Sequence, residues 1–420
     1  MATIVDLQNK YTEILNGKNA IVTSLENKGV VVPDNIKVKD IPVLIDGIST
    51  GFPNGKEWTR GSGTTDAFYR IEYVNGVFIA LGALVDDNDT PIGIYYSTDG
   101  KTWIQSNITS GIFREFSYAK GVCIAGSTGT SNISSDGSLC YSTDGKSWTK
   151  IASGRCNALH YYNGTWLVNM SGDLYSSTNG KSWTALYSSD LGLCTHHIAN
   201  INGLWVVGSS THGGLYYSSD LKVWTKSDAP SSDCFQMYSN DGMIVASFDD
   251  IQEMYYSTDG KTWTPSNLAD RVIDIAYLDD VWVGKRYQHG IYYSTDGKTW
   301  IQSNITSSTG YILGDFTCID GIKFTYNLSN LYYSTNGEIW ETCTLPGIIR
   351  SAPVKECGIF LISTSQGVYY STDGKIWIQS NITSDFIENF ICKNGIWVCG
   401  SSSTSYKNGL YYSVVWEPTI

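Results

Sequence analysis

The chain has 420 residues, a length that indicates either several domains or one domain built by repetition. Its formal net charge of −12 argues against nucleic acid as a partner, because binding a phosphate backbone requires clustered lysine and arginine. Glycine (42), tyrosine (29) and tryptophan (14) are abundant and only 16% of residues are charged, which is typical of all-β proteins with many tight turns.

The first 50 residues predict a small helical segment. Ile4, Leu7, Tyr11 and Ile14 follow the 3–4 spacing of an amphipathic helix. A piece of this size buries too little apolar area to be stable alone, so it requires the rest of the chain, copies of itself or a partner protein. The start has no basic or apolar signal region, and no window approaches the roughly 18 apolar residues of a membrane span. We therefore expect synthesis in the cytoplasm without a signal peptide, and no membrane insertion.

The rest of the chain is a repeat. The string Tyr-Tyr-Ser-Thr-Asp-Gly-Lys-x-Trp recurs with variations every 35 to 45 residues, with its tryptophan at positions 103, 148, 183, 224, 263, 300, 340 and 377. This period matches one propeller blade of four short antiparallel strands. The sequence therefore predicts a single large β-propeller over residues 51–420.

Two hairpins are expected in each unit. The second is formed by Tyr-Tyr-Ser, the turn Thr-Asp-Gly-Lys and a tryptophan that starts the outer strand and packs between blades. The first has a turn dipeptide such as Asn-Gly, typical of type I′ turns, in which both residues have positive φ. Nine such dipeptides begin at Asn75, Lys120, Asn163, Asn202, Asp241, Asp279, Asp320, Cys357 and Asn394.

The two ends of the repeat complete each other. The ninth unit stops at Trp416 without its Asp-Gly turn, while residues 53–59 contain a turn and an outer strand with no unit before them. We expect residues 54–62 to supply the missing strand of the last blade, because an open ring would leave sheet edges exposed. Nine blades is the predicted number, with eight blades and one capping unit as the alternative.

The ten cysteines are scattered and have no C-x-x-C pairs. Most occur in apolar, strand-like contexts such as Gly-Val-Cys-Ile-Ala around Cys123. The sequence predicts that they are buried small hydrophobic residues.

Two resemblances extend this interpretation. The repeated Ser-Thr-Asp-Gly-Lys-x-Trp, over 54–416, resembles the Asp-box of sialidase-like propellers, although it is one residue shorter; this likeness concerns fold only. Residues 1–50, with ILNGKNAI at 14–21, KGVVVP at 28–33 and IPVLIDGI at 41–48, look like the short adaptor of phage tail-fibre and baseplate proteins. The resemblance implies a receptor-binding or tail-fibre protein of a phage or phage-like (tailocin) particle. It would lie at the tail tip or baseplate, held to tail proteins through residues 1–50, and a homo-oligomer is compatible with this role.

The candidate binding face is the rim that carries the variable connections. Both hairpins of each blade point to one rim, which is uniform, so its recurrent aspartates are expected to be turn formers. At the opposite rim the connections differ between blades, and they mix aromatic rings with amide and charged groups, which suits a bacterial surface polysaccharide. The predicted ligand-binding residues are Asp86, Asp87, Asp89, Asp249, Gln252, Arg286, Tyr287, His289, Tyr326, Asn327, Tyr406 and Lys407.

Composition and repetition favour a binding protein over an enzyme. Residues 95–109 and 292–306 are identical copies, which indicates a shared framework instead of a unique catalytic site, and the seven arginines are spread over different blades. We therefore predict no catalytic residues. A glycan-cleaving depolymerase or sialidase-like hydrolase, and a purely structural tail component, are the alternatives. Residues 86–89 have the oxygen ligands that Ca²⁺ prefers but not the EF-hand pattern, so no cofactor is predicted, with Ca²⁺ as the alternative.

Overall fold

The structure is a computed structural model that describes residues 53–415 apart from 65, 83, 86–89, 129–136, 187–197, 210–211, 241, 252, 269–271, 287–289, 307–313, 384–386 and 402–408. The helices predicted within residues 1–50 lie outside the described residues. No helix among the described residues has the length and apolarity needed to cross a membrane.

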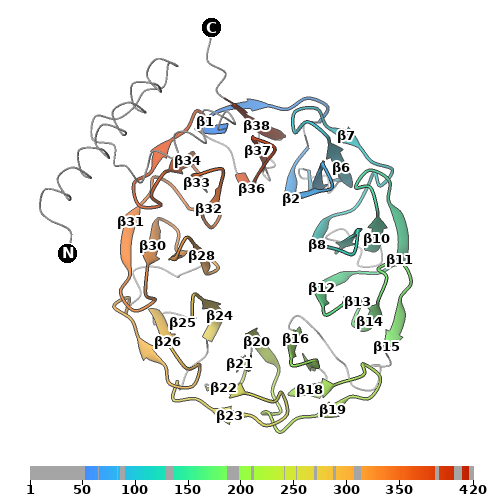
Figure 1. Ribbon diagram of the computed structural model, residues 1–420, viewed down its shortest axis with the longest axis vertical. Coiled ribbons are helices and arrows are strands. Elements are labelled where there is room, and N and C mark those ends of the chain that lie inside the picture. The colour runs from blue at the N-terminus through green and yellow to red at the C-terminus, as the bar shows by residue number, and fades with distance from the viewer. Residues whose placement is uncertain are drawn as a thin grey trace, which may run out of the picture.

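Nine four-stranded antiparallel sheets are arranged in a closed ring (Figure 1), so the prediction of a nine-bladed propeller is confirmed. We name the blades A to I in chain order. Blade A contains β2 (Phe68–Val74), β3 (Val77–Gly82), β6 (Ile94–Ser97) and β7 (Ile104–Gln105), and blade B contains β8 (Phe113–Ala119), β9 (Val122–Ser127), β10 (Ser138–Ser142) and β11 (Thr149–Ser153). Blade C contains β12 (Cys156–Tyr162), β13 (Thr165–Met170), β14 (Asp173–Ser177) and β15 (Thr184–Leu186), and blade D contains β16 (Ile198–Ile201), β17 (Leu204–Gly208), β18 (Leu215–Ser218) and β19 (Thr225–Lys226).

Blades E to H follow the same order from the channel outward. Blade E contains β20 (Cys234–Asn240), β21 (Met243–Phe248), β22 (Met254–Ser257) and β23 (Thr264–Pro265), and blade F contains β24 (Val272–Leu278), β25 (Val281–Arg286), β26 (Gly290–Ser294) and β27 (Ile301–Gln302). Blade G contains β28 (Thr317–Ile319), β29 (Ile322–Tyr326), β30 (Asn330–Ser334) and β31 (Glu341–Thr344), and blade H contains β32 (Val354–Glu356), β33 (Ile359–Thr364), β34 (Gly367–Ser371) and β35 (Ile378–Gln379). In addition, β4 (Leu84–Val85) pairs with β5 (Thr90–Pro91) in the connection between β3 and β6.

Blade I is built from both ends of the described chain. Its inner strands are β36 (Ile387–Lys393), β37 (Ile396–Ser401) and β38 (Leu410–Val415), and its outer strand is β1 (Pro53–Arg60). Strand β1 pairs antiparallel with β38, so the two ends of the propeller meet in one sheet.

The first hairpins have the backbone that their sequences predict. Asn75 and Gly76 have φ of 51° and 84°, as a type I′ turn requires. Positive φ recurs at Lys120, Asn163, Asn202, Asp279, Asp320, Cys357 and Asn394.

A shared hydrogen-bond pattern builds the second hairpins, which we call the Asx-Gly turns. In blade A the backbone N–H of Gly100 donates to Ser97 Oγ at 2.9 Å, and the N–H groups of Lys101 and Thr102 donate to Asp99 Oδ1 at 2.8 and 2.7 Å. The same bonds recur in blades B to H, with asparagine as the acceptor in C and G and with leucine in place of the glycine in D. The aspartates of these turns are therefore turn formers, as predicted.

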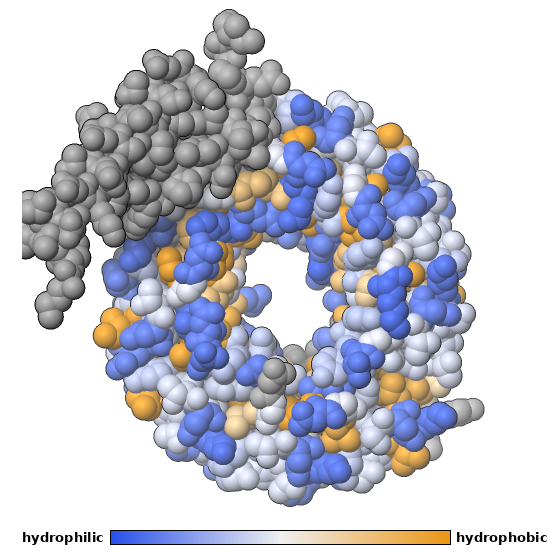
Figure 2. Space-filling view, viewed as in Figure 1, coloured by the Kyte–Doolittle hydropathy of each residue, from blue (hydrophilic) through white to orange (hydrophobic). Residues whose placement is uncertain are grey.

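The hydrophobic core lies between the blades, in nine clusters that each span one junction. At the junction of I and A, for example, Trp103 and Phe78 pack with Val398 and Leu410. Each blade is therefore held by its two neighbours. We call the rim with both turns of every blade the hairpin rim and the opposite one the loop rim. Figure 2 shows that the ring is open along its axis, with the innermost strands lining the channel.

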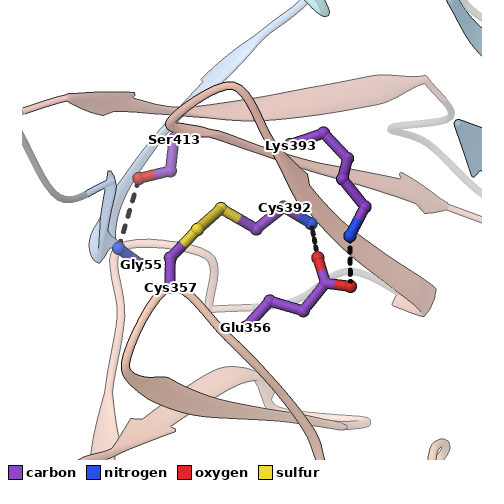
Figure 3. Close-up of a disulfide and its surroundings, with 6 residues drawn as sticks. All are labelled: Gly55, Glu356, Cys357, Cys392, Lys393 and Ser413. Atoms are coloured by element: carbon purple, nitrogen blue, oxygen red, sulfur yellow. Dashed lines mark hydrogen bonds and ion pairs between the residues drawn. A yellow bond between two sulfur atoms is a disulfide. The ribbon is translucent and has the colours of Figure 1, made fainter. Parts of the chain in front are cut away.

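The prediction for the cysteines is wrong for one pair. Cys357, in the first hairpin of blade H, forms a disulfide with Cys392 on β36 of blade I, with Cα atoms 6.5 Å apart (Figure 3). The two residues are 35 positions apart and meet because the blades are neighbours in the ring. Buried free thiols are found at Cys123, Cys140, Cys156 and Cys399.

Candidate functional site

Eight of the twelve predicted ligand-binding residues lie outside the described residues, namely Asp86, Asp87, Asp89, Gln252, Tyr287, His289, Tyr406 and Lys407. The other four are on the loop rim of three consecutive blades: Asp249 in E, Arg286 in F, and Tyr326 and Asn327 in G. The side chain of Asp249 is exposed.

Arg286, Tyr326 and Asn327 are engaged in local structure. The Arg286 guanidinium stacks 5.0 Å from the centre of the Tyr292 ring and donates to its hydroxyl. Asn327 is 2% exposed; its Oδ1 accepts the N–H groups of Ser329 and Asn330, so it is a turn former and not an open contact. Tyr326 is half-buried and packs in the cluster between G and H.

A polar cup that the sequence did not reveal lies at the loop rim where blades I and A meet. It has a volume of about 500 Å³ and is lined by Arg60, Thr64, Asp66, Tyr95 and the intervening glycines and serine. Arg60 ends β1, residues 61–67 connect it to β2, and Tyr95 is on β6. The backbone N–H of Gly61 donates to the carbonyl of Leu410, which fixes this connection beside the start of β38.

A single carboxylate organises this seam cup. The hydroxyls of Tyr95 and Thr64 donate to Asp66 Oδ2 at 2.8 and 2.9 Å. Burial and the bond to Asp66 raise the pKa of Tyr95, so its phenol stays protonated and neutral. The cup thus combines one arginine, one carboxylate and several hydroxyls, a set suited to a polar, largely neutral ligand.

Five of the predicted contacts belong by sequence to the two blades that form the seam cup, although they lie outside the described residues. Asp86, Asp87 and Asp89 come between β3 and β6 of blade A, and Tyr406 and Lys407 come between β37 and β38 of blade I. The predicted closure of the ring could have indicated the cup, because closure brings Gly61 beside Leu410 at the start of β38.

A second polar hollow, of about 590 Å³, is lined by residues of the innermost strands of blades A, B and I. Arg114 stacks 4.9 Å from the ring centre of Tyr69, and Arg70 forms an ion pair with Glu72. Burial raises the pKa of the neighbouring Glu115, although Arg70 acts to lower it. Two of the arginines that appeared dispersed in the sequence therefore meet at this place.

No group of three or more histidine, cysteine, aspartate or glutamate side chains within the described part of the chain is arranged to hold a metal ion. The acidic run suggested for Ca²⁺ is outside that part.

Comparisons with known proteins identify the fold alone. No family model matches the chain, and no curated protein matches it. Among solved structures it is similar to the computationally designed Ika8 protein (TM-score 0.50, 12% identity, 72% of this chain and 96% of that chain). It is also similar to BamB from Moraxella catarrhalis (0.46, 9%, 72% and 98%). The extracellular domain of the putative one component system BT4673 from B. thetaiotaomicron aligns at 0.38 and 10% identity, over 82% and 57%. The resemblances to Asp-box propellers and to phage tail fibres remain predictions.

Proposed function

We propose that this protein is a receptor-binding protein of a phage or phage-like tail, which binds a bacterial surface polysaccharide through the loop rim of its propeller. The observation that carries the proposal is the seam cup. It gathers hydroxyl, carboxylate and guanidinium groups in one hollow on the loop rim, at the junction of blades I and A.

The chemistry of the cup supports a sugar ligand. Saccharide hydroxyls both donate and accept hydrogen bonds, and Asp66, Thr64, Tyr95 and Arg60 supply both kinds of partner in one hollow. A rigid ring held by nine interblade cores keeps such a site preorganised, which reduces the entropy lost on binding.

The remaining parts of the proposal rest on the sequence. Residues 1–50 attach the protein to tail or baseplate proteins, and the assembled particle presents it as a homo-oligomer. The protein binds and does not cleave, and it requires no cofactor.

Binding of the fluorescently labelled full-length chain to intact bacteria and to their purified wall polysaccharide tests the proposal. We expect binding to a subset of strains, weakened at least tenfold by combining Asp66→Asn with Tyr95→Phe. Tyr369→Phe is the matched control, because Tyr369 holds the position of Tyr95 in blade H. If no strain or polysaccharide is bound, or if the control weakens binding equally, the proposal is wrong.

The arginine pair at the channel favours a second function, hydrolysis of the bound glycan. Arg70 and Arg114 line the hollow and suit an anionic sugar, and Glu115, which follows Arg114 on β8 but does not line the hollow, has a raised pKa, the property of a general acid. Measuring reducing ends released from the same polysaccharide separates the two functions. Release that is abolished by Glu115→Gln would establish the hydrolase, and binding without release would support the binding protein.

A further inference from the structure

The junction between blades C and D is built differently from the other junctions. Elsewhere the glycine of each Asx-Gly turn packs against the second strand of the preceding blade: a Cβ at Gly145 would lie 3.1 Å from Ile79 and 3.5 Å from Val77. In blade D this glycine is replaced by Leu221, which has a φ of 61°. The equivalent close contacts of the other blades involve Gly55, Gly100, Gly180, Gly260, Gly297, Gly337 and Gly374.

The surface that would receive this turn is also changed. The second strand starts with an apolar residue in eight blades, but β13 of blade C starts with Thr165. The side chain of Leu221 packs at the edge of the core cluster between C and D, which contains Leu167 of β13. A cleft of about 760 Å³, lined by Leu221 and Thr165 among others, lies here on the hairpin rim, the rim that was expected to be uniform.

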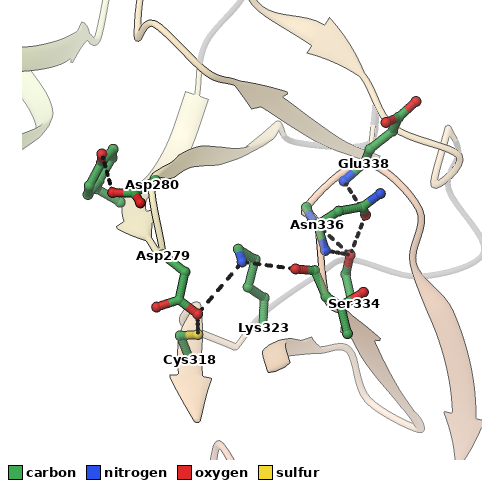
Figure 4. Close-up of polar contacts among 10 residues, drawn as sticks. Asp279, Asp280, Cys318, Lys323, Ser334, Asn336 and Glu338 are labelled. Atoms are coloured by element: carbon green, nitrogen blue, oxygen red, sulfur yellow. Dashed lines mark hydrogen bonds and ion pairs between the residues drawn. The ribbon is translucent and has the colours of Figure 1, made fainter. Parts of the chain in front are cut away.

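The channel-side contacts also differ among the junctions. At five of the nine junctions the residue two before the first-hairpin turn pairs with the turn residue of the preceding blade, and no such pair joins the described residues of C and D. The Tyr118 hydroxyl donates to Asn75 Oδ1, and the Cys318 thiol donates to Asp279 Oδ2 (Figure 4). The disulfide in Figure 3 joins the same two positions, which are also paired in Lys355–Asp320 and in Asn394–Tyr73.

Asn163 and Asn200 hold these two positions at the junction of C and D, and both line the cleft. Oδ1 of Asn200 accepts the N–H of Gly203, but its Nδ2 is enclosed and has no hydrogen-bond partner within the described residues. An enclosed amide without a partner is costly, so a rotation of the Asn200 side chain that turns Nδ2 toward a ligand oxygen in the cleft would be favourable.

Aromatic rings complete the wall. The ring of Tyr162 is 42% exposed and contacts Trp205 edge to face, with centroids 5.8 Å apart. The charged side chains that line the cleft, Asp220 and Lys222, have opposite signs. Its volume is within the roughly 300–1,000 Å³ of small-molecule sites.

We propose that this cleft is a second binding site, for a neutral saccharide of a few rings. Aromatic rings accept the C–H face of a pyranose, and the amides of Asn163 and Asn200 with the hydroxyl of Thr165 exchange hydrogen bonds with sugar hydroxyls. The site is on the rim opposite the seam cup and does not depend on the function proposed for that cup.

Saturation-transfer NMR on the full-length chain, with maltotriose and N,N′,N″-triacetylchitotriose as probes, tests the site. We expect at least one probe to bind, and Tyr162→Ala to raise its Kd at least tenfold. Leu221→Gly gives the turn the glycine of the other blades and removes a side chain that lines the cleft, so it should also abolish binding while the protein stays folded. The matched control is Tyr238→Ala, because Tyr238 is 38% exposed and makes the same edge contact with Trp282 in the next blade.

Loss of saturation transfer in Tyr162→Ala and Leu221→Gly, with retention in Tyr238→Ala, supports the site. If neither probe receives saturation, or if all three variants behave alike, the proposal is overturned. Cell binding that depends on Asp66 and Tyr95 but not on Tyr162 separates the failure of this site from the failure of the seam cup.

Discussion

Residues of the Asx-Gly turns show how one carboxylate can organise a hairpin. In blade B, Asp144 Oδ1 accepts the N–H groups of Lys146 and Ser147 and the hydroxyl of Ser142. Partial burial acts to raise the pKa of Asp144, but these hydrogen bonds outweigh it and the pKa is lowered. Aspartate is not required for the geometry, since Asn179 and Asn336 accept the equivalent amides.

We therefore expect Asp144→Asn to keep the stability of the ring at pH 7, and Asp144→Ala to lower it by about 1–3 kcal/mol, because two turn amides lose their acceptor. The folded-state pKa is below the unfolded value, so the stabilisation by the carboxylate is present above about pH 4 and is lost as the pH falls through the folded pKa. Urea unfolding at pH 7 and pH 3 measures both effects. A steeper loss in acid for Asp144→Asn than for the natural protein would contradict the argument.

Among the elements, the first hairpins reverse the chain, and at five of the nine junctions they also tie one blade to the next around the channel. The tie varies in chemistry while its position is kept. Where it is a thiol and a carboxylate, burial and Asp279 raise the pKa of Cys318 to about 11, so the thiol stays protonated and donates. Where both positions are cysteine, the tie is covalent.

The disulfide between Cys357 and Cys392 should stabilise the fold more than a hydrogen bond at the same positions, and its contribution should depend on reductant. Replacing Cys357 and Cys392 by serine should lower the free energy of unfolding by about 3–4 kcal/mol, as expected for a cross-link that closes a loop of this length. Denaturation with and without a thiol reductant measures it. Reductant should lower the denaturation midpoint of the natural protein and leave that of the double variant unchanged. If the midpoint of the natural protein does not change with reductant, the bond is not formed.

Features that depend on residues close together in the sequence could be predicted, and features that depend on contacts between blades could not. The turn at Asn75 and the turn at Asp99 depend on neighbouring residues, so their repetition predicted the strands, the blades and the number nine. The disulfide, the seam cup and the cleft at Leu221 depend on which blades are adjacent. Aligning the hairpins of the blades would have placed Cys357 and Cys392 in the positions of Asn75 and Tyr118.

At the scale of the whole molecule, the ring closes through the split ninth blade. Ser413, at the end of one segment, accepts the N–H of Gly55 at the start of the other, which reproduces part of an Asx-Gly turn from two remote pieces. Asn381 then clamps the outer strand: its Nδ2 donates to the carbonyl of Trp58, and its Oδ1 accepts the N–H of Trp58. Asn304 makes the same pair of bonds to Trp340 at a junction inside the chain.

We expect Asn381→Ala and Asn304→Ala to lower the global stability by similar amounts, about 1–2 kcal/mol, since each removes two hydrogen bonds. Their local effects should differ, because β1 is not joined to β38 by a turn. Hydrogen–deuterium exchange should rise in residues 53–60 for Asn381→Ala, whereas Asn304→Ala should leave that segment protected. Equal protection of β1 in both variants would show that the clamp does not hold the seam.

The split blade also sets the order of events during synthesis. Gly55 and Ser413 are separated by 358 residues, so at ribosomal rates the first strand waits about 20–70 s for its partner to be made. For all of that time β1 has no sheet to join, and the earlier blades end at an unprotected junction. The nascent chain therefore cannot attain its native circle before Ser413 has been made, which makes this interval the period when pairing with a second nascent copy competes with self-closure.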